Sequence, residues 1–278
     1  MASYLRPELL ADALSALAGG ARTVLAGGTD FYPARVGRLV DEDVLDITAI
    51  GELRGVRAER GGLRIGATTT WSDLLAAPLP PWCRALQQAA REVGGVQIQN
   101  AGTVAGNLCN ASPAADGVPA LLALGAEVEL ASVAGRRRLP LGEFVLGNRR
   151  TARGPQELVS AVLVPPWSER ARSVFLKLGA RRYLVISIAM VAAVIEPDAA
   201  GRVARCGVAV GACSAVAQRL SALEQALVGA TLDVRIGARA HQEHLAGLTP
   251  IDDVRGTAEY RADAALTLVR RALESLAA

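Results

Sequence analysis

The stretch TVAGNLCNASPAAD, residues 103–116, interrupts a chain that is otherwise rich in Ala, Leu, Val and Arg. The stretch instead concentrates small and polar residues, which either hydrogen-bond locally or permit positive φ angles. The stretch therefore predicts a shaped loop, and not a regular element, with a polar group bound against it. Its small and polar residues are Thr103, Gly106, Asn107, Asn110, Ser112 and Asp116.

A second segment of this kind, AGGTDF at residues 26–31, directly follows an apolar run that predicts a strand at 23–26. Glycines let the backbone approach a ligand closely and turn its N–H groups toward an anion. An ordinary tight turn has the same composition and is the alternative interpretation. The P-loop and Rossmann consensus patterns are both missing from the sequence.

The two segments together suit the two ends of a dinucleotide. Thr103, Gly106 and Asn107 offer a second anion-binding turn, while the polar side chains from 110 to 116 can bind hydroxyls or the edge of a ring. The alternative is a capping role, in which Ser112 or Asp116 caps a short apolar helix at 117–125.

Lys177 is the single lysine among the 30 basic residues of the chain. A lysine presents a compact point charge, whereas an arginine presents a broad planar fork, so the two are not interchangeable beside a ligand. This makes Lys177 a candidate ligand contact, with chance retention in an arginine-biased chain as the alternative.

Length, composition and charge exclude several classes of protein. The 278 residues are 51% apolar, which predicts a globular fold, and a net charge of only +3 argues against a dedicated nucleic-acid or membrane-surface binder. The triplet Arg136–Arg138 is interpreted as a hairpin turn. The apolar run at 184–195 is too short to span a bilayer, and no signal-peptide pattern is present, so we expect a cytoplasmic protein.

Cysteine and histidine usage gives little support for catalysis by side chains. The cysteines lack the C-x-x-C spacing of metal or iron–sulfur sites and are expected to be free, buried thiols. His241 and His244 are the only histidines and are expected to share a helical face without binding metal. The cysteines are Cys83, Cys109, Cys206 and Cys213.

Hydrophobic periodicity predicts a mixed α/β organisation with a boundary near residue 170, beside Pro165-Pro166. Before it we expect helices at 7–18, 71–93 (interrupted near 77–81) and 117–125, and strands at 23–26, 43–47, on both sides of Gly61-Gly62, at 126–133 and at 157–164. After it we expect a strand at 173–180, an apolar run at 186–195 and an alternating strand at 202–210, then helices near 216–228, 232–246 and 259–277.

Four segments carry a family resemblance: AGGTDF, IGATTTWSDL, NAGTVAGNLCNASPAADGVPALLALGAEVEL and FLKLGARR. In order and spacing the chain resembles the flavin-binding subunit of molybdenum hydroxylases, a group that includes the xanthine dehydrogenase flavin subunit and the carbon monoxide dehydrogenase medium subunit. The resemblance implies an α+β protein with an FAD-binding fold of the vanillyl-alcohol oxidase type over residues 1–170, in two α/β subdomains at about 1–52 and 53–170. A carboxy-terminal α+β domain of the CO dehydrogenase flavoprotein type would occupy residues 171–278.

The resemblance also assigns cofactor-binding roles. The backbone of residues 26–30 would hold the FAD pyrophosphate, Lys177 would lie near the flavin pyrimidine ring, and Ile186 would pack close to the isoalloxazine. Two departures stand out: Ala105 replaces a family glycine, and Tyr183–Val185 replaces acidic residues on the electron-acceptor side. The residues implied are Ala26, Gly27, Gly28, Thr29, Asp30, Phe31, Thr103, Gly106, Asn107, Asn110, Asp116, Lys177 and Ile186.

The function implied by the resemblance is electron transfer through FAD, from iron–sulfur clusters to an acceptor such as NAD. The [2Fe-2S] clusters and the molybdenum cofactor would reside on two partner subunits, in a heterotrimer or a dimer of heterotrimers. We expect the substrate to be a purine or another N-heterocycle, ahead of aldehydes and carbon monoxide. The alternatives are a self-sufficient flavin reductase or oxidase of the same fold, and a non-catalytic assembly protein.

Overall fold

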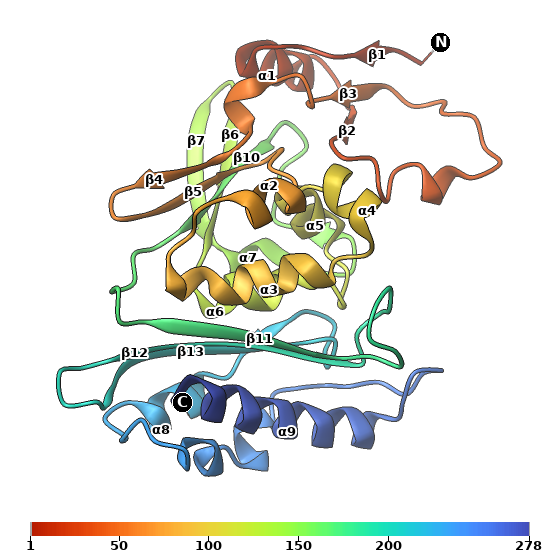
Figure 1. The fold of residues 1–278 in the computed structure, drawn as a ribbon. Coiled ribbons are helices and arrows are strands. Elements are labelled where there is room, and N and C mark those ends of the chain that lie inside the picture. The colour runs from red at the N-terminus through yellow and green to blue at the C-terminus, as the bar shows by residue number, and fades with distance from the viewer. Residues whose placement is uncertain (1, 278) are drawn as a thin grey trace.

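The computed structural model describes residues 2–277 and stacks three tiers of secondary structure along the long axis of the molecule (Figure 1). The amino-terminal part forms the upper tier, a larger sheet with its helices forms the middle tier, and a second sheet backed by a long helix forms the lower tier. The described helices include none that is both long and apolar enough to cross a membrane.

The upper tier is a parallel three-stranded sheet of order β1-β3-β2, covered by α1. Leu10, Ala13 and Leu17 recur on one face of α1 and are buried, which is the spacing of an amphipathic helix. The helix expected from residue 7 begins at Leu10, after an extended Leu9 that follows the bend from β1. The elements are β1 (Tyr4–Leu5), α1 (Leu10–Ala18), β2 (Thr23–Leu25), η1 (Pro33–Arg35), β3 (Val44–Asp46) and η2 (Gly51–Leu53).

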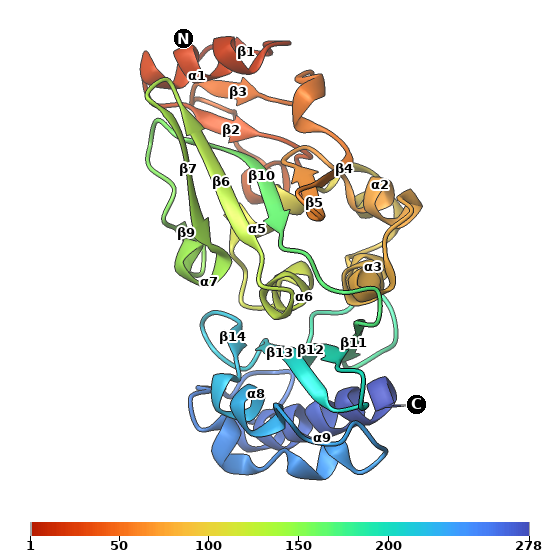
Figure 2. The same ribbon diagram turned by 90° about the vertical axis from the view of Figure 1, so that its left-hand side faces the viewer.

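The middle tier is an antiparallel sheet of order β4-β5-β10-β6-β7, with helices packed below and beside it (Figure 2). The hairpin expected at Gly61-Gly62 is confirmed by the β4–β5 pair. The elements are β4 (Val56–Glu59), β5 (Gly62–Gly66), α2 (Trp71–Ala76), η3 (Pro81–Cys83), α3 (Arg84–Glu92), α4 (Val96–Ala101), α5 (Val104–Asn110), α6 (Gly117–Ala123), β6 (Glu127–Ser132), β7 (Gly135–Pro140), α7 (Leu141–Phe144), β8 (Val145–Gly147), β9 (Arg150–Thr151) and β10 (Leu158–Val164).

The interpretation of Arg136–Arg138 as a turn is wrong, because the three arginines lie in strand β7. The turn itself falls at residues 133–134. Pairing with β6 brings Arg136 and Arg138 to the carboxylate of Glu129, while Arg137 reaches Glu157 on the other face. Ion pairing thus accounts for an arginine run inside a strand.

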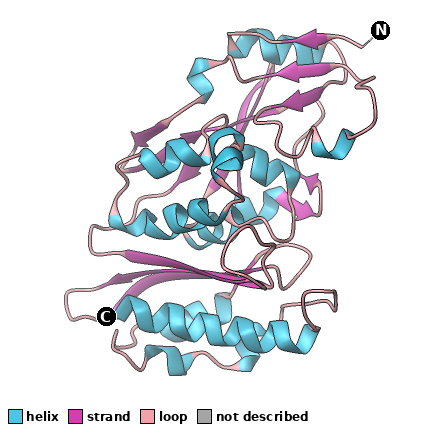
Figure 3. Ribbon diagram, turned by 45° about the vertical axis from the view of Figure 1, so that its right-hand side comes forward, coloured by secondary structure: helices cyan, strands magenta, loops and turns pink. Residues whose placement is uncertain are grey.

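The lower tier is an antiparallel sheet of order β11-β12-β13-β14, enclosed between two layers of helices. Helices α3 and α6 contact its upper face and α9 its lower face (Figure 3). The helix expected at 232–246 is wrong, since only two short 3₁₀ turns form there. The elements are β11 (Arg172–Leu178), β12 (Ala189–Pro197), β13 (Val203–Gly211), β14 (Gln218–Arg219), α8 (Ser221–Leu227), η4 (Ile236–Arg239), η5 (Gln242–Leu245) and α9 (Ala258–Ala277).

Strand β12 explains why the sequence at 189–195 is apolar without alternation. Met190, Ala192 and Val194 join the core shared with the middle tier, whereas Val191 and Ala193 join the core between the sheet and α9. A strand buried on both faces is apolar at every position. The middle and lower tiers therefore share one continuous core, and the expected boundary near residue 170 stays a prediction.

Candidate functional site

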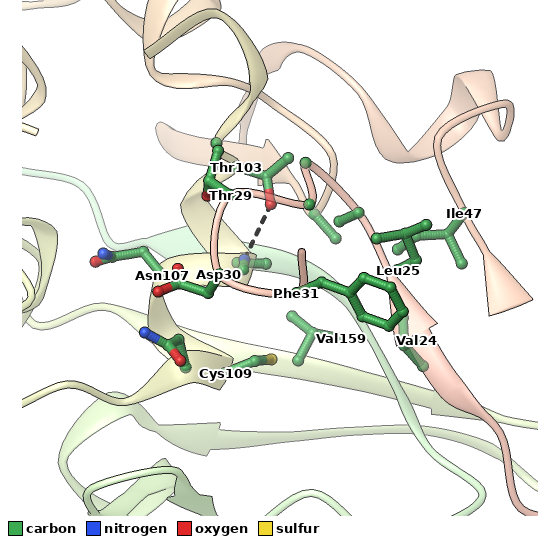
Figure 4. Close-up of a pocket in the computed structure, with 18 of the residues that line it drawn as sticks. Val24, Leu25, Thr29, Asp30, Phe31, Ile47, Thr103, Asn107, Cys109 and Val159 are labelled. Carbon is green, nitrogen blue, oxygen red and sulfur yellow. Dashed lines mark hydrogen bonds between the residues drawn. The ribbon is translucent and has the colours of Figure 1, made fainter. Parts of the chain in front are cut away.

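A pocket of about 480 Å³ lies between the upper and middle tiers, a size typical of small-molecule sites. One wall comes from β2 and the glycine segment after it, and the other from α5 and β10 (Figure 4). Val24, Leu25, Ile47 and Val159 supply an apolar surface, while Thr29, Asp30, Thr103 and Asn107 supply polar groups.

The glycine segment has no room for side chains. A Cβ on Gly27 would lie 1.8 Å from the carbonyl oxygen of Ala101, and Gly28 has a φ of +71°. Gly27 thus allows the upper tier to approach α4 closely, and Gly28 allows the chain to turn back toward α5. Gly27 and Gly28 therefore form a bare strip of backbone along the pocket, flanked by the side chains of Ala26, Thr29, Asp30 and Phe31.

The stretch 103–116 begins with the short helix α5 and continues as a turn, so the prediction of a loop over 103–116 is wrong for residues 104–110. The Thr103 hydroxyl accepts the N–H of Gly106 at 3.0 Å and caps α5, and a Cβ on Gly106 would lie 2.7 Å from that oxygen. The helix ends at Ala111, whose φ is +48°. Ala105 lies inside the helix and is not among the positive-φ residues, so the replacement of the family glycine introduces no strain.

Asn107 carries the clearest sign that the pocket holds a polar ligand. Its Oδ1 atom is buried and has no hydrogen-bond partner among residues 2–277, and a Cβ on Gly117 would lie 3.2 Å from it. A buried polar atom normally has a partner, because leaving it unsatisfied costs about 1–3 kcal/mol. The carboxamide is therefore available to a bound molecule.

Ten of the thirteen residues implied by the resemblance line this one pocket: Ala26, Gly27, Gly28, Thr29, Asp30, Phe31, Thr103, Gly106, Asn107 and Asn110. The other three, Asp116, Lys177 and Ile186, lie outside its lining. Ile186 is 58% exposed in the segment between β11 and β12.

Asp116 and Lys177 form a buried ion pair with each other. The Lys177 Nζ donates to Asp116 Oδ2 at 2.9 Å and to the Glu92 carbonyl oxygen at 3.3 Å, and Ser187 donates to the other Asp116 oxygen at 3.0 Å. Burial raises the pKa of the Asp116 carboxyl, and the Lys177 charge opposes that shift. The alternative of an Asp116 cap is wrong, because its side chain makes no capping bond to α6; Ser112 Oγ accepts only from Ala114, at 3.3 Å.

Four arginines that the sequence analysis missed also line the pocket: Arg22, Arg35, Arg149 and Arg153. They come from segments far apart in the chain, and hydrophobic periodicity does not predict which pocket a long, polar side chain will enter. The cluster of arginines at 149–153 was the one available signal.

Cysteine and histidine side chains offer no evident nucleophile or metal site. The four thiols are unpaired, and burial raises the pKa of Cys109, which lines the pocket, to about 11. His241 and His244 stack at 5.8 Å between ring centroids around η5. Within residues 2–277 there is no cluster of three or more His, Cys, Asp or Glu side chains placed to hold a metal.

A bare glycine strip and a capped helix that line one pocket, beneath a parallel sheet, form the kind of site that binds a dinucleotide. Residues 1–167 match the model of the FAD binding domain in molybdopterin dehydrogenase, and residues 175–276 match the CO dehydrogenase flavoprotein C-terminal domain. The chain belongs to this family of molybdenum hydroxylase flavoproteins and is an oxidoreductase subunit.

Curated relatives and a solved structure agree with this assignment. The chain is 35% identical to the nicotinate dehydrogenase FAD-subunit of Eubacterium barkeri, covering 75% of this chain and 72% of the relative. It is 32% identical to the carbon monoxide dehydrogenase medium chain of Afipia carboxidovorans, covering 98% and 95%. The reconstituted CO dehydrogenase from Oligotropha carboxidovorans superposes with a TM-score of 0.92 at 28% identity, covering 100% and 98%. The predicted fold class is thereby confirmed.

The residues in the pocket fit an FAD. The glycine strip offers close backbone approach, Asn107 offers an unpaired carboxamide, and the arginines offer positive charge for phosphates. The apolar wall formed by β2 and β10 suits the aromatic parts of a dinucleotide.

Proposed function

We propose that this protein is the FAD-binding electron-transfer subunit of a multi-subunit molybdenum hydroxylase, with FAD bound in the pocket between the upper and middle tiers. The observation that carries the proposal is the unpartnered, buried carboxamide oxygen of Asn107, a residue that lines the same pocket as Gly27 and Gly28. Family membership supports the class of cofactor.

When bound, FAD supplies the redox chemistry, accepting electrons one at a time and releasing them in pairs. The protein provides binding and positioning. The backbone at Gly27 and Gly28 would lie against the phosphates, and the Asn107 carboxamide would hold a polar group of the cofactor. Thr103 uses one lone pair to cap α5, which leaves its hydroxyl proton free to donate.

The apolar side chains from β2 and β10 exclude water around the bound cofactor. The roles of Asp116, Lys177 and Ile186 beside the flavin stay predictions, since the ion pair occupies the first two. In this arrangement Lys177 holds the sheet of the lower tier against α3 and against the turn before α6.

The complex we propose contains an iron–sulfur subunit and a molybdenum-cofactor subunit, as a heterotrimer or a dimer of heterotrimers, with NAD as the first acceptor to test. For the substrate we propose a purine or another N-heterocycle. The name of the nicotinate dehydrogenase relative supports an N-heterocycle, while the name of the carbon monoxide dehydrogenase relative supports carbon monoxide as the substrate. A cytoplasmic location is proposed on the four unpaired thiols.

The test begins with the absorption spectrum of the purified chain and identification of any flavin released by heat. We expect oxidised-flavin bands at about 370 and 450 nm, releasable FAD, and weaker retention of FAD in Asn107→Ala. A colourless chain that also fails to take up added FAD contradicts the proposal and favours the assembly-protein alternative.

Purification from the native host tests the partners separately. We expect iron–sulfur and molybdenum subunits to accompany the chain, and NAD reduction to require the whole complex. Activity of the isolated chain with a reductant and an acceptor favours instead the self-sufficient flavin enzyme.

A further inference from the structure

The charges that line the pocket are not balanced within the protein. Arg22 lies 3.8 Å from the Asp43 carboxylate, and Arg35 pairs with Glu42. The other two lining arginines, Arg149 and Arg153, form no ion pair among residues 2–277, and Asp30 is the one acidic residue in the lining. The pocket therefore presents unneutralised positive charge on one side.

Arg149 occupies a backbone position that favours glycine. It lies in the turn between β8 and β9, where Gly147 pairs with Arg150, and its φ is +55°. A side chain in this left-handed region costs roughly 1 kcal/mol, and such strain gathers at functional sites. The structure shows no hydrogen bond or ion pair of the Arg149 side chain among the described residues to offset the strain.

Arg153 lies four residues further on and is half-buried. Its Nη1 donates to the carbonyl oxygens of Gly154 and Glu157 at 3.2 and 2.8 Å. The Glu157 carboxylate is held by Arg137, through Nε at 2.5 Å and Nη2 at 2.7 Å. Arg153 is thus anchored by backbone contacts and keeps its charge and its remaining N–H donors for the pocket.

We propose that Arg149 and Arg153 bind the diphosphate of the dinucleotide and make the site selective for FAD over flavins that lack it. Two guanidinium groups match the two negative charges of a diphosphate, and each can form paired, charge-assisted hydrogen bonds with phosphate oxygens. The proposal rests on the FAD site proposed above and assigns a specific role to two residues within it.

The test measures binding of FAD, FMN and riboflavin to the full-length chain freed of flavin, at several salt concentrations. Arg149→Gln and Arg153→Gln are each expected to weaken FAD binding about tenfold, equivalent to about 1.4 kcal/mol, and to reduce its salt dependence. Riboflavin binding stays unchanged, because riboflavin carries no phosphate. The matched control is Arg150→Gln, which removes the same charge from the same hairpin but lies outside the pocket lining.

Arg149→Gly separates binding from folding. It removes the strain at a positive φ, so the melting temperature of the flavin-free chain is expected to equal or exceed that of the wild type while FAD binding weakens. Unchanged FAD affinity in both glutamine variants overturns the proposal, as does an equal loss for FAD and riboflavin. A wild-type chain that binds none of the three flavins overturns the proposed function itself.

Discussion

Gly27 shows how one missing Cβ controls the pocket at the scale of a residue. Its Cα passes so close to α4 that an added Cβ would meet the backbone of Ala101 at 1.8 Å, and backbone cannot rotate away as a side chain can. The glycine strip and the end of α4 are therefore fitted to each other. Any larger residue must push the upper tier off the middle tier.

We expect Gly27→Ala to lower the free energy of unfolding by about 1–3 kcal/mol, the usual cost of overpacking, and to weaken FAD binding. Urea unfolding and flavin titration of the purified variant measure the two effects. Gly20→Ala is the control, because nothing lies within 4 Å of the Cβ it would add. Equal stability of the two variants would show that α4 adjusts freely.

At this scale the structure brings several residues named from the sequence to one pocket, but the charges of that pocket were not predicted. Gly27, Thr103 and Asn107 were predicted because local turns and caps depend on residue type. Arg149 and Arg153 were missed because their place depends on how a distant hairpin packs beside α5. Lys177 was expected at the ligand, and its burial against Asp116 was not foreseeable without the fold.

At the scale of an element, strand β6 is distinguished by a buried carboxylate, Glu129. It accepts hydrogen bonds from Arg64 at 2.6 Å, Ser160 at 2.7 Å, Arg136 at 3.1 Å and Arg138 at 3.3 Å. Burial alone would raise its pKa, but the bonds from Arg64 and Ser160 and the surrounding charge lower it to about 2. The carboxylate thereby links β5, β6, β7 and β10 across the sheet.

This shift predicts a pH-dependent contribution to stability. Because the pKa is lower in the folded state, the stabilisation is complete above the ordinary glutamate pKa and is lost as the pH falls toward 2. We expect Glu129→Gln to cost about 3 kcal/mol at pH 7 and progressively less below pH 4, as measured by urea unfolding across that range.

Glu127→Gln is the matched control, since this glutamate lies on the same strand and forms no ion pair among the described residues. It should change stability little at any pH. A Glu129→Gln effect that stays constant with pH would mean that the loss arises from packing and not from charge.

Some of the correctly predicted elements have one buried face on a regular repeat, while β10 was found from a continuous apolar run that is buried at every position. Helix α1 and the β4–β5 hairpin are of the first kind. The two 3₁₀ turns at 236–245 were mistaken for a helix because their geometry is set by α9: a Cβ on Gly237 would lie 2.7 Å from the Arg270 carbonyl oxygen. Packing outweighed helical spacing in that segment.

At the scale of the whole molecule, the Lys177–Asp116 pair joins the lower tier to the middle one. Both side chains are largely buried, at 6% and 11% exposed, and Ser187 completes the link. A buried ion pair of this kind contributes little to the free energy of unfolding while it is intact. Removing one partner is costly, because the other charge is then buried without a counter-charge.

We expect Lys177→Met to lower the free energy of unfolding by about 3–5 kcal/mol, and the double variant Lys177→Met with Asp116→Asn to recover part of that loss. Urea unfolding of the single and double variants gives the coupling. Arg172→Met is the control, since it removes a cation from β11 that bonds only to backbone carbonyls. A Lys177→Met loss no larger than that of the control would argue against a structural pair.

The order of strands in the middle sheet has a consequence for synthesis on the ribosome. Strand β5 pairs with β10, so Leu63 cannot pair until Val164, about a hundred residues later, has been synthesised. Strand β10 also supplies Val159 to the pocket wall. Non-local pairing of this kind is slow and leaves a strand edge exposed until its partner arrives. The pocket is therefore complete only after β10 has paired, and nascent chains that stop short of β10 leave facing edges of β5 and β6 unpaired and prone to aggregation.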